Sequence, residues 1–136
     1  MTGIVDQLFE EAAKARKNSY APYSNFKVGA AILSADGKIF AGTNIEEAAY
    51  KTICAEAAAI ANMVTSTGRQ VITEVMVIGG EEGDNKLVTP CGHCRQYLRE
   101  HMDGEMKIHV AGPEGIRKSF TLNELLPYSF GPENLR

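Results

Sequence analysis

Three cysteines and one glutamate are the residues whose types and spacing best suit chemistry. All three cysteines of the 136-residue chain lie in two short segments, Cys54-Ala55-Glu56 and Pro90-Cys91-Gly92-His93-Cys94. A lone cysteine is most often a small buried hydrophobic residue, but Cys-x-x-Cys spacing is typical of zinc ligands. Three thiolates leave one corner of a tetrahedral zinc ion open to water, whereas a structural site uses four protein ligands. The spacing therefore favours a catalytic zinc site.

Glu56 follows Cys54 by two residues. If a helix begins near Cys54, the carboxylate projects from the same first turn and can reach a water on the metal. A carboxylate in that place can accept and return protons during hydrolysis. We therefore predict that Glu56 is the catalytic proton shuttle.

A histidine as fourth ligand would close the site and make it structural. His93 should point away from a metal held by the cysteines on either side of it. His101 is seven residues past Cys94, about 10 Å along a helix. His109 falls in an expected strand and stays open as a ligand. The open site is favoured over a closed structural zinc site and over no metal.

Hydrophobic periodicity and turn residues predict the elements that position these groups. Helices are expected over 4–14, from Cys54 to Met63 with closure at Gly68, from Pro90 to about 101, and over 122–126. Strands are expected over 27–33, 39–43, 71–78, 107–111 and 117–121. Thr52 is a candidate N-cap, and Pro90 suits a first helical position. Both cysteine segments then lie at helix N-termini, where free amides stabilise thiolates.

The order of these elements predicts an α/β domain, with helices on both faces of a sheet of about five strands. The length suits a single domain over residues 1–136. No apolar run approaches the roughly 20 residues of a membrane span. The first residues lack a basic segment before an apolar core, so we expect no secretory signal.

Charge and cysteine content bear on partners and compartment. The chain has 14 basic and 17 acidic residues, for a net charge of −3, and no block of Lys or Arg. A nucleic acid polymer is therefore an unexpected partner. Zinc-binding thiolates must be reduced, and three cysteines cannot all pair within one chain. We expect a cytoplasmic location.

Cys-Ala-Glu followed by Pro-Cys-x-x-Cys resembles the zinc-dependent cytidine deaminases, specifically the small homotetrameric kind. The likeness covers nearly the whole chain, including residues 21–24, 26, 28–31, 44–46, 125–127 and 129–133. It implies a three-layer α/β/α cytidine deaminase-like fold with a mixed sheet, Zn²⁺ bound by Cys54, Cys91 and Cys94, and Glu56 as the proton shuttle. The implied reaction converts cytidine and deoxycytidine to uridine and deoxyuridine with release of ammonia, in pyrimidine salvage.

The resemblance also implies a set of substrate contacts. Phe26 would be a platform for the pyrimidine ring, and the backbone near Ala55 and Cys91 would read its polar edge. The remaining contacts that it implies are Asn44 and Glu46 to the ribose 3′-hydroxyl, Tyr50, and Phe130, which would reach a neighbouring subunit's active site in a homotetramer.

Three departures from most relatives surround the expected zinc. Ala57 stands where most have Arg, His93 where many have Ala, and the stretch Lys51-Thr52-Ile53 is one residue shorter than usual. Arg95, His93 or Lys51 would then supply the missing positive charge. Deamination of another aminopyrimidine, such as a cytosine-containing antibiotic or a modified nucleoside, is the close alternative. A non-catalytic structural zinc module is the second, and an enzyme that edits a polymer is weaker still.

Overall fold

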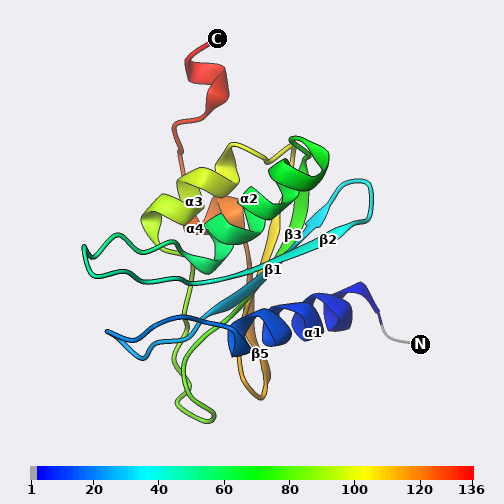
Figure 1. Ribbon diagram of the computed structural model, residues 1–136. Coiled ribbons are helices and arrows are strands. Elements are labelled where there is room, and N and C mark those ends of the chain that lie inside the picture. The colour runs from blue at the N-terminus through cyan, green and yellow to red at the C-terminus, as the bar shows by residue number, and fades with distance from the viewer. Residues whose placement is uncertain (1–2) are drawn as a thin grey trace.

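The computed structural model describes residues 3–136 and contains a five-stranded sheet covered by helices (Figure 1). The helices are α1 (Ile4–Lys17), α2 (Ala55–Thr67), α3 (Gly92–Arg99), α4 (Leu122–Leu125) and the short 3₁₀ helix η1 (Pro132–Asn134). The strands are β1 (Gly29–Ser34), β2 (Ile39–Thr43), β3 (Ile72–Ile78), β4 (Lys107–Gly112) and β5 (Gly115–Thr121). No helix in this part of the chain is long and apolar enough to cross a membrane.

The sheet is mixed, as expected, with the strand order β2-β1-β3-β4-β5. β1 and β2 form a hairpin whose turn contains Gly37, at a positive φ of 90°. β3 and β4 are parallel and are connected through α3, while the other neighbours are antiparallel. The N-terminal ends of α2 and α3 therefore lie over the same face of the sheet (Figure 1).

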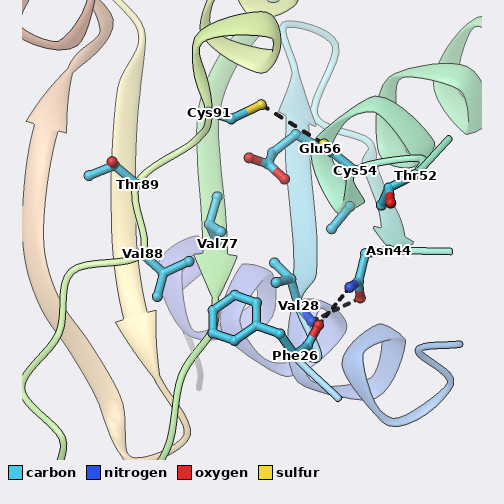
Figure 2. Close-up of a pocket in the computed structure, with 11 residues that line it drawn as sticks. Phe26, Val28, Asn44, Thr52, Cys54, Glu56, Val77, Val88, Thr89 and Cys91 are labelled. Atoms are coloured by element: carbon cyan, nitrogen blue, oxygen red, sulfur yellow. Dashed lines mark hydrogen bonds between the residues drawn. The ribbon is translucent and has the colours of Figure 1, made fainter. Parts of the chain in front are cut away.

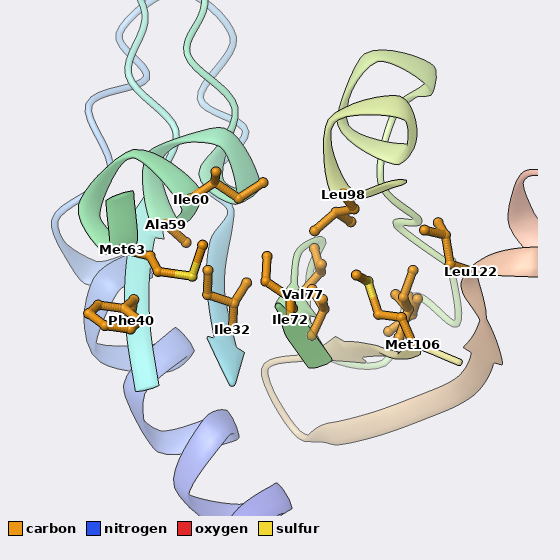
Figure 3. Packing of buried hydrophobic residues seen from close by; sticks show 13 residues of the cluster. Ile32, Phe40, Ala59, Ile60, Met63, Ile72, Val77, Leu98, Met106 and Leu122 are labelled. Atoms are coloured by element: carbon orange, nitrogen blue, oxygen red, sulfur yellow. The ribbon is translucent and has the colours of Figure 1, made fainter. Parts of the chain in front are cut away.

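Alternation along the strands builds a hydrophobic core on each face. Val75 and Val77 of β3 pack on the face covered by α2 and α3, whereas Met76 and Ile78 pack against α1. Figure 3 shows the first of these clusters, in which Ile60 and Leu98 reach from the two helices toward the sheet. The expected three-layer α/β/α arrangement is confirmed.

Two glycines set how closely the helices approach the β1–β2 hairpin. A Cβ on Gly29 would overlap the Ala12 carbonyl of α1, and a Cβ on Gly42 would overlap the Ala59 backbone of α2. Any side chain at Gly42 would therefore push α2 away from the sheet. This close packing holds the start of α2, and with it Cys54 and Glu56, in a defined place.

The helix starts differ in detail from the sequence predictions. Cys54 itself is the N-cap of α2, with extended backbone (φ −74°, ψ 152°) and no side-chain cap bond. Cys91 is likewise the N-cap of α3. The prediction that Thr52 caps α2 is therefore wrong, and Pro90 precedes the cap of α3 instead of opening the helix. The prediction that both cysteine segments lie at helix N-termini is confirmed.

Candidate active site at two helix starts

The three cysteine side chains meet where the two helices begin. The Sγ atoms of Cys54, Cys91 and Cys94 all lie within 4.8 Å of one another, and those of Cys54 and Cys91 are 3.9 Å apart. Zinc–sulfur bonds of about 2.3 Å in tetrahedral geometry place two sulfurs about 3.8 Å apart. The donor chemistry and spacing therefore fit a zinc ion.

Burial affects the protonation of the Cys94 and Cys54 thiols. Burial raises the pKa of Cys94, and the negative charges of Glu56, Cys54 and Cys91 raise it further. Burial likewise raises the pKa of Cys54, with Cys91 adding to the effect. A divalent cation must displace these thiol protons, so metal binding releases protons and depends on pH.

None of the histidines joins the cysteine cluster within residues 3–136. The exposed ring of His93 lies 5.7 Å from that of Tyr97. His109 is tied up elsewhere, with Nε2 2.7 Å from Glu74 Oε2 and Nδ1 2.7 Å from Ser119 Oγ. His101 is buried just beyond α3. The cluster therefore has the three ligands of an open site, and the closed structural alternative finds no fourth ligand in the described chain.

His101 instead makes the stability of the fold depend on pH. Its side chain is 5% exposed, and Nδ1 has no hydrogen-bond partner among the described residues. Burial, aided by the charge of Arg69, lowers the pKa of the imidazole from 6.5. The unfolded chain thus takes up a proton at a higher pH than the folded one. This contribution to folding stability is complete above about pH 6.5 and is lost as the pH falls.

A His101→Leu variant should therefore show a flatter pH dependence of stability. Between about pH 7.5 and 5.5, we expect it to lose less free energy of unfolding than the wild type does. Urea unfolding of both zinc-loaded proteins measures this, because effects of pH on the metal are common to both and cancel in the difference. Equal losses in the two proteins would contradict the assignment.

Glu56 is the second residue of α2 and is only 4% exposed. Its carboxylate lies close to the cysteines and points into a cavity (Figure 2). Burial raises the pKa of this carboxyl above its ordinary value. A raised pKa makes the carboxylate a stronger base, and a carboxyl can return the proton that it has taken. The residue has the place and the acidity of a general acid–base catalyst.

The cavity has a volume of about 210 Å³ and walls that are mostly apolar. Phe26 and Val88 lie side by side along one wall, and Val77 of β3 lies between them and the other end of the cavity. Glu56, Cys54 and Cys91 occupy that end (Figure 2). A mostly apolar pocket with a few convergent polar groups is typical of small-molecule sites. Its residues are Phe26, Val28, Asn44, Thr52, Cys54, Ala55, Glu56, Val77, Val88, Thr89 and Cys91.

Comparison with known proteins decides the family. Residues 4–110 match the family model described as the cytidine and deoxycytidylate deaminase zinc-binding region. The chain belongs to this deaminase family. A cytidine deaminase from Sporosarcina psychrophila is 41% identical over 132 residues, covering 96% of this chain and 94% of that protein. One from Mycobacterium tuberculosis (strain H37Rv) is 36% identical over 126 residues, covering 91% and 87%.

Solved structures agree with this assignment. The crystal structure of cytidine deaminase from Burkholderia pseudomallei superposes with a TM-score of 0.82 at 35% identity, covering 96% of this chain and 100% of that one. The Mycobacterium tuberculosis cytidine deaminase gives 0.76 at 34% identity, covering 96% and 99%. The metal for which the cysteine cluster of this deaminase is suited is therefore zinc.

Asn44 lines the same cavity and also holds its wall in place. Its Oδ1 accepts hydrogen bonds from Ser19 Oγ (2.6 Å) and from the Val28 backbone N–H (3.0 Å). Its Nδ2 donates to the Phe26 carbonyl at 2.7 Å. The sequence reading missed this role and missed Ser19, because the residues are close only after β2 returns beside the segment that precedes β1.

Glu46 and Tyr50 lie in a second cavity of about 220 Å³, which adjoins the first because Thr52 lines both. Glu46 accepts hydrogen bonds from the Tyr23 and Ser24 backbone N–H groups and from Ser24 Oγ. The Ser24 hydroxyl is the main cause of the lowered pKa of Glu46. Tyr50 is 84% exposed beside this cavity. The structure thus separates these two residues from the Phe26 wall.

The other expected contacts fall in two places. Ala55 lines the first cavity beside Glu56. Phe130 lines neither cavity and is 57% exposed on the C-terminal tail, where its carbonyl accepts a hydrogen bond from Gln96. Figure 1 shows this tail leaving the body of the molecule. Within one chain, Phe130 is therefore not part of the candidate active site.

The departure at Ala57 removes a cation that Arg95, one of the candidates to replace it, does not supply. Ala57 presents no cation to the sulfurs. Arg95 directs its guanidinium to the Pro90 carbonyl (2.7 Å), the Leu125 carbonyl (2.7 Å) and Thr89 Oγ1 (2.8 Å). Arg95 therefore supports the backbone that carries Cys91, through three hydrogen bonds that all end on neutral oxygens.

Proposed function

We propose that this protein catalyses hydrolytic deamination of cytidine and deoxycytidine to uridine and deoxyuridine, with release of ammonia. The observation that carries the proposal is a zinc-suited cluster of three cysteines, with no fourth protein ligand among the described residues, beside a buried carboxyl in a small apolar cavity. Close relatives named as cytidine deaminases support the choice of substrate.

The chain's own residues divide the chemistry between them. Zinc, when bound, supplies Lewis-acid activation of a water molecule. Glu56 takes a proton from the attacking water, delivers it to N3 of the pyrimidine, and carries a second proton to the departing ammonia. Burial of Glu56 suits this cycle, because a raised pKa makes its carboxylate a stronger base for the first proton transfer.

The cavity walls place the base for attack at C4. The Phe26 ring offers a flat apolar surface beside Val88. The backbone around Ala55 and Cys91 lies at the polar end, where it can contact the amino and carbonyl edge. Orienting C4 toward the catalytic group lowers the entropic cost of reaction. Phe26 and Ala55 are therefore assigned to binding the pyrimidine, and Tyr50, which lines the adjoining second cavity, is assigned to substrate binding there.

The hydrogen bonds that Asn44 and Glu46 already make indicate which of them would donate to the ribose 3′-hydroxyl and which would accept from it. Both acceptor positions of Asn44 Oδ1 are used by the protein, whereas Nδ2 keeps one free hydrogen after its bond to Phe26. Glu46 is kept ionised by its lowered pKa and retains accepting capacity on Oε2. A 3′-hydroxyl can accept from Asn44 and donate to Glu46, so both of its hydrogen-bonding functions are satisfied.

A substrate panel followed by the loss of ultraviolet absorbance tests the proposal. We expect cytidine and deoxycytidine to be the best substrates, and 3′-deoxycytidine to lose roughly 10- to 100-fold in kcat/KM because it leaves polar partners unpaired. Cytidine 5′-monophosphate should also be a poor substrate, because within residues 3–136 neither cavity offers a cation to its phosphate. No Lys or Arg is among the described residues lining the two cavities, and Glu46 and Glu47 lie in the second.

The panel includes cytosine, modified aminopyrimidine nucleosides and single-stranded DNA. Faster turnover of any of these than of cytidine would replace the proposed substrate. Absence of turnover on the whole panel by a zinc-loaded protein would refute the proposed activity.

The assembly and cellular role complete the proposal. We assign residues 1–136 to one catalytic domain that works as a homotetramer in cytoplasmic pyrimidine salvage. Phe130 supports shared active sites, because its exposed ring lies outside both cavities of its own chain. Exposed apolar side chains near the second cavity, those of Tyr23, Tyr50 and Ile53, also favour coverage by another subunit. Sedimentation equilibrium should give four times the 14.8 kDa chain mass, and a monomer mass would contradict this.

A further inference from the structure

The segment between β3 and α3, residues 79–91, contains no helix or strand, yet it forms part of the first cavity. Val88 and Thr89 line the cavity, and Cys91 at its end belongs to the cysteine cluster. Figure 2 shows Val88 beside the Phe26 ring. A segment without regular structure needs other contacts to hold such groups in place.

Arg117 of β5 supplies these contacts at the first half of the segment. Its Nη1 donates to Asp84 Oδ1 (2.5 Å) and to the Lys86 carbonyl (2.6 Å), and its Nη2 donates to the Glu81 carbonyl (2.7 Å). Its Nε and Nη2 also donate to the two oxygens of Glu114 at 2.8 and 3.1 Å. All five N–H donors of the guanidinium are therefore used, and the side chain is only 9% exposed.

The surroundings of Arg117 are shaped for a guanidinium. A Cβ on Gly112 would overlap the guanidinium, so only glycine leaves room for the arginine there. The Asp84 carboxylate also accepts the backbone N–H groups of Glu81 and Lys86, which with Arg117 lower its pKa to about 2. Asp84 therefore stays ionised and binds both the segment's own backbone and Arg117.

The segment is tied to the Phe26 side of the cavity as well. Arg16 Nη2 donates to the Gly80 carbonyl (2.9 Å), and its Nε donates to the carbonyl of Lys27, the residue after Phe26 (3.0 Å). The side chain of Val88 packs on Gly79, where a Cβ would come within 2.8 Å of Val88 Cγ1. The positions of both Phe26 and Val88 in the cavity wall thus depend on how the first half of the segment is held.

The second half of the segment is held separately. Arg95 binds Thr89 and the Pro90 carbonyl, directly before Cys91. The contacts of Arg117 end at Lys86, two residues before Val88. We propose that Arg117 is a positioning residue that keeps Val88 against the Phe26 ring and so sets affinity for the pyrimidine nucleoside, whereas Arg95 holds the metal-binding end. This assignment rests on the proposed function.

Arg117→Lys tests the assignment, because lysine keeps the charge but offers three donors from one point and cannot serve four partners at once. We expect KM for cytidine to rise on the order of tenfold, with kcat within about twofold and zinc content unchanged. Hydrogen exchange should become faster in residues 79–89. Arg95→Lys, the same substitution at the other end, should lower zinc content instead. Lys118→Ala, which removes an exposed neighbouring cation on β5, should leave KM, kcat, zinc content and hydrogen exchange unchanged.

Asp84→Asn provides a second variant in case Arg117→Lys does not fold. It weakens the bond to Arg117 while leaving the Arg117–Glu114 pair intact, and we expect a rise in KM of about threefold. Unchanged KM in both variants, or a fall in kcat and zinc content in proportion to the rise in KM, would overturn the proposal. An inactive wild type would refute the proposed function, whereas faster hydrogen exchange in residues 79–89 would still test the role of Arg117 in holding the segment.

Discussion

Replacing Glu56 with glutamine should reduce kcat on cytidine by roughly 10²- to 10⁴-fold, the usual contribution of a positioned general acid–base group. Glutamine has nearly the same shape but cannot accept and return a proton. Glu56 is 4% exposed and its pKa is raised by burial. Because the neutral amide is easier to bury than a carboxylate, we expect no loss of folding stability. Steady-state kinetics with metal analysis measures the effect.

A matched control separates this effect from a general loss of acidic charge. Glu105→Gln makes the same substitution at an exposed residue that lines neither cavity and should leave kcat unchanged. The proton-shuttle role requires that Glu56→Gln retains stoichiometric zinc while losing activity. Full activity in the zinc-loaded Glu56→Gln variant would rule out the assigned role.

Replacing Cys94 with serine should abolish both zinc binding and activity. Cys94 is fully buried between the starts of α2 and α3, and its Sγ is one of the three donors. Serine is nearly isosteric, but its hydroxyl is a poor zinc ligand compared with a thiolate. We expect zinc to fall from stoichiometric to near zero on dialysis against a weak chelator, with cytidine turnover below detection.

The same variant should lose the stabilisation that the metal provides. Zinc that binds the folded chain raises its stability by mass action, so removing zinc should lower the Tm of the wild type. The Cys94→Ser variant should melt close to the metal-free wild type and should not respond to added zinc. A variant that keeps zinc, or that gains stability from it as the wild type does, would show that Cys94 is not a ligand.

The strand and helix pattern was accessible from the sequence because it depends on near neighbours. The continuous apolar run in 75–78 marks a strand buried on both faces, and Gly68 marks the end of α2, where it is the C-cap. The exact helix starts were less accessible. By residue type, Thr52 was a better candidate for the N-cap of α2, and Pro90 for the first residue of α3. Cys54 and Cys91 are the N-caps instead, because the packing of the two helices over the sheet decides where each helix begins.

The chemical centre could be predicted because few side chains can do its work. Three cysteines at metal-ligand spacing, with a glutamate two residues after the first of them, restrict the possible chemistry whatever the fold. The walls of the site could not be predicted in this way. Val77 and Val88 are ordinary apolar residues in the sequence, and they line the cavity only because β3 and the segment after it pass beside Phe26.

Long-range hydrogen bonds belong to the tertiary structure alone. Ser19 orients Asn44 across 25 residues of sequence, and Arg117 reaches Asp84 across 33. Such pairs depend on strand order, which places β5 beside β4 and so brings Arg117 within reach of the segment between β3 and α3. The sequence by itself therefore predicted the three cysteines as metal ligands and Glu56 as the proton shuttle through their residue types. Only the fold decided which neutral and charged neighbours hold them, because those contacts form between segments that no local pattern connects.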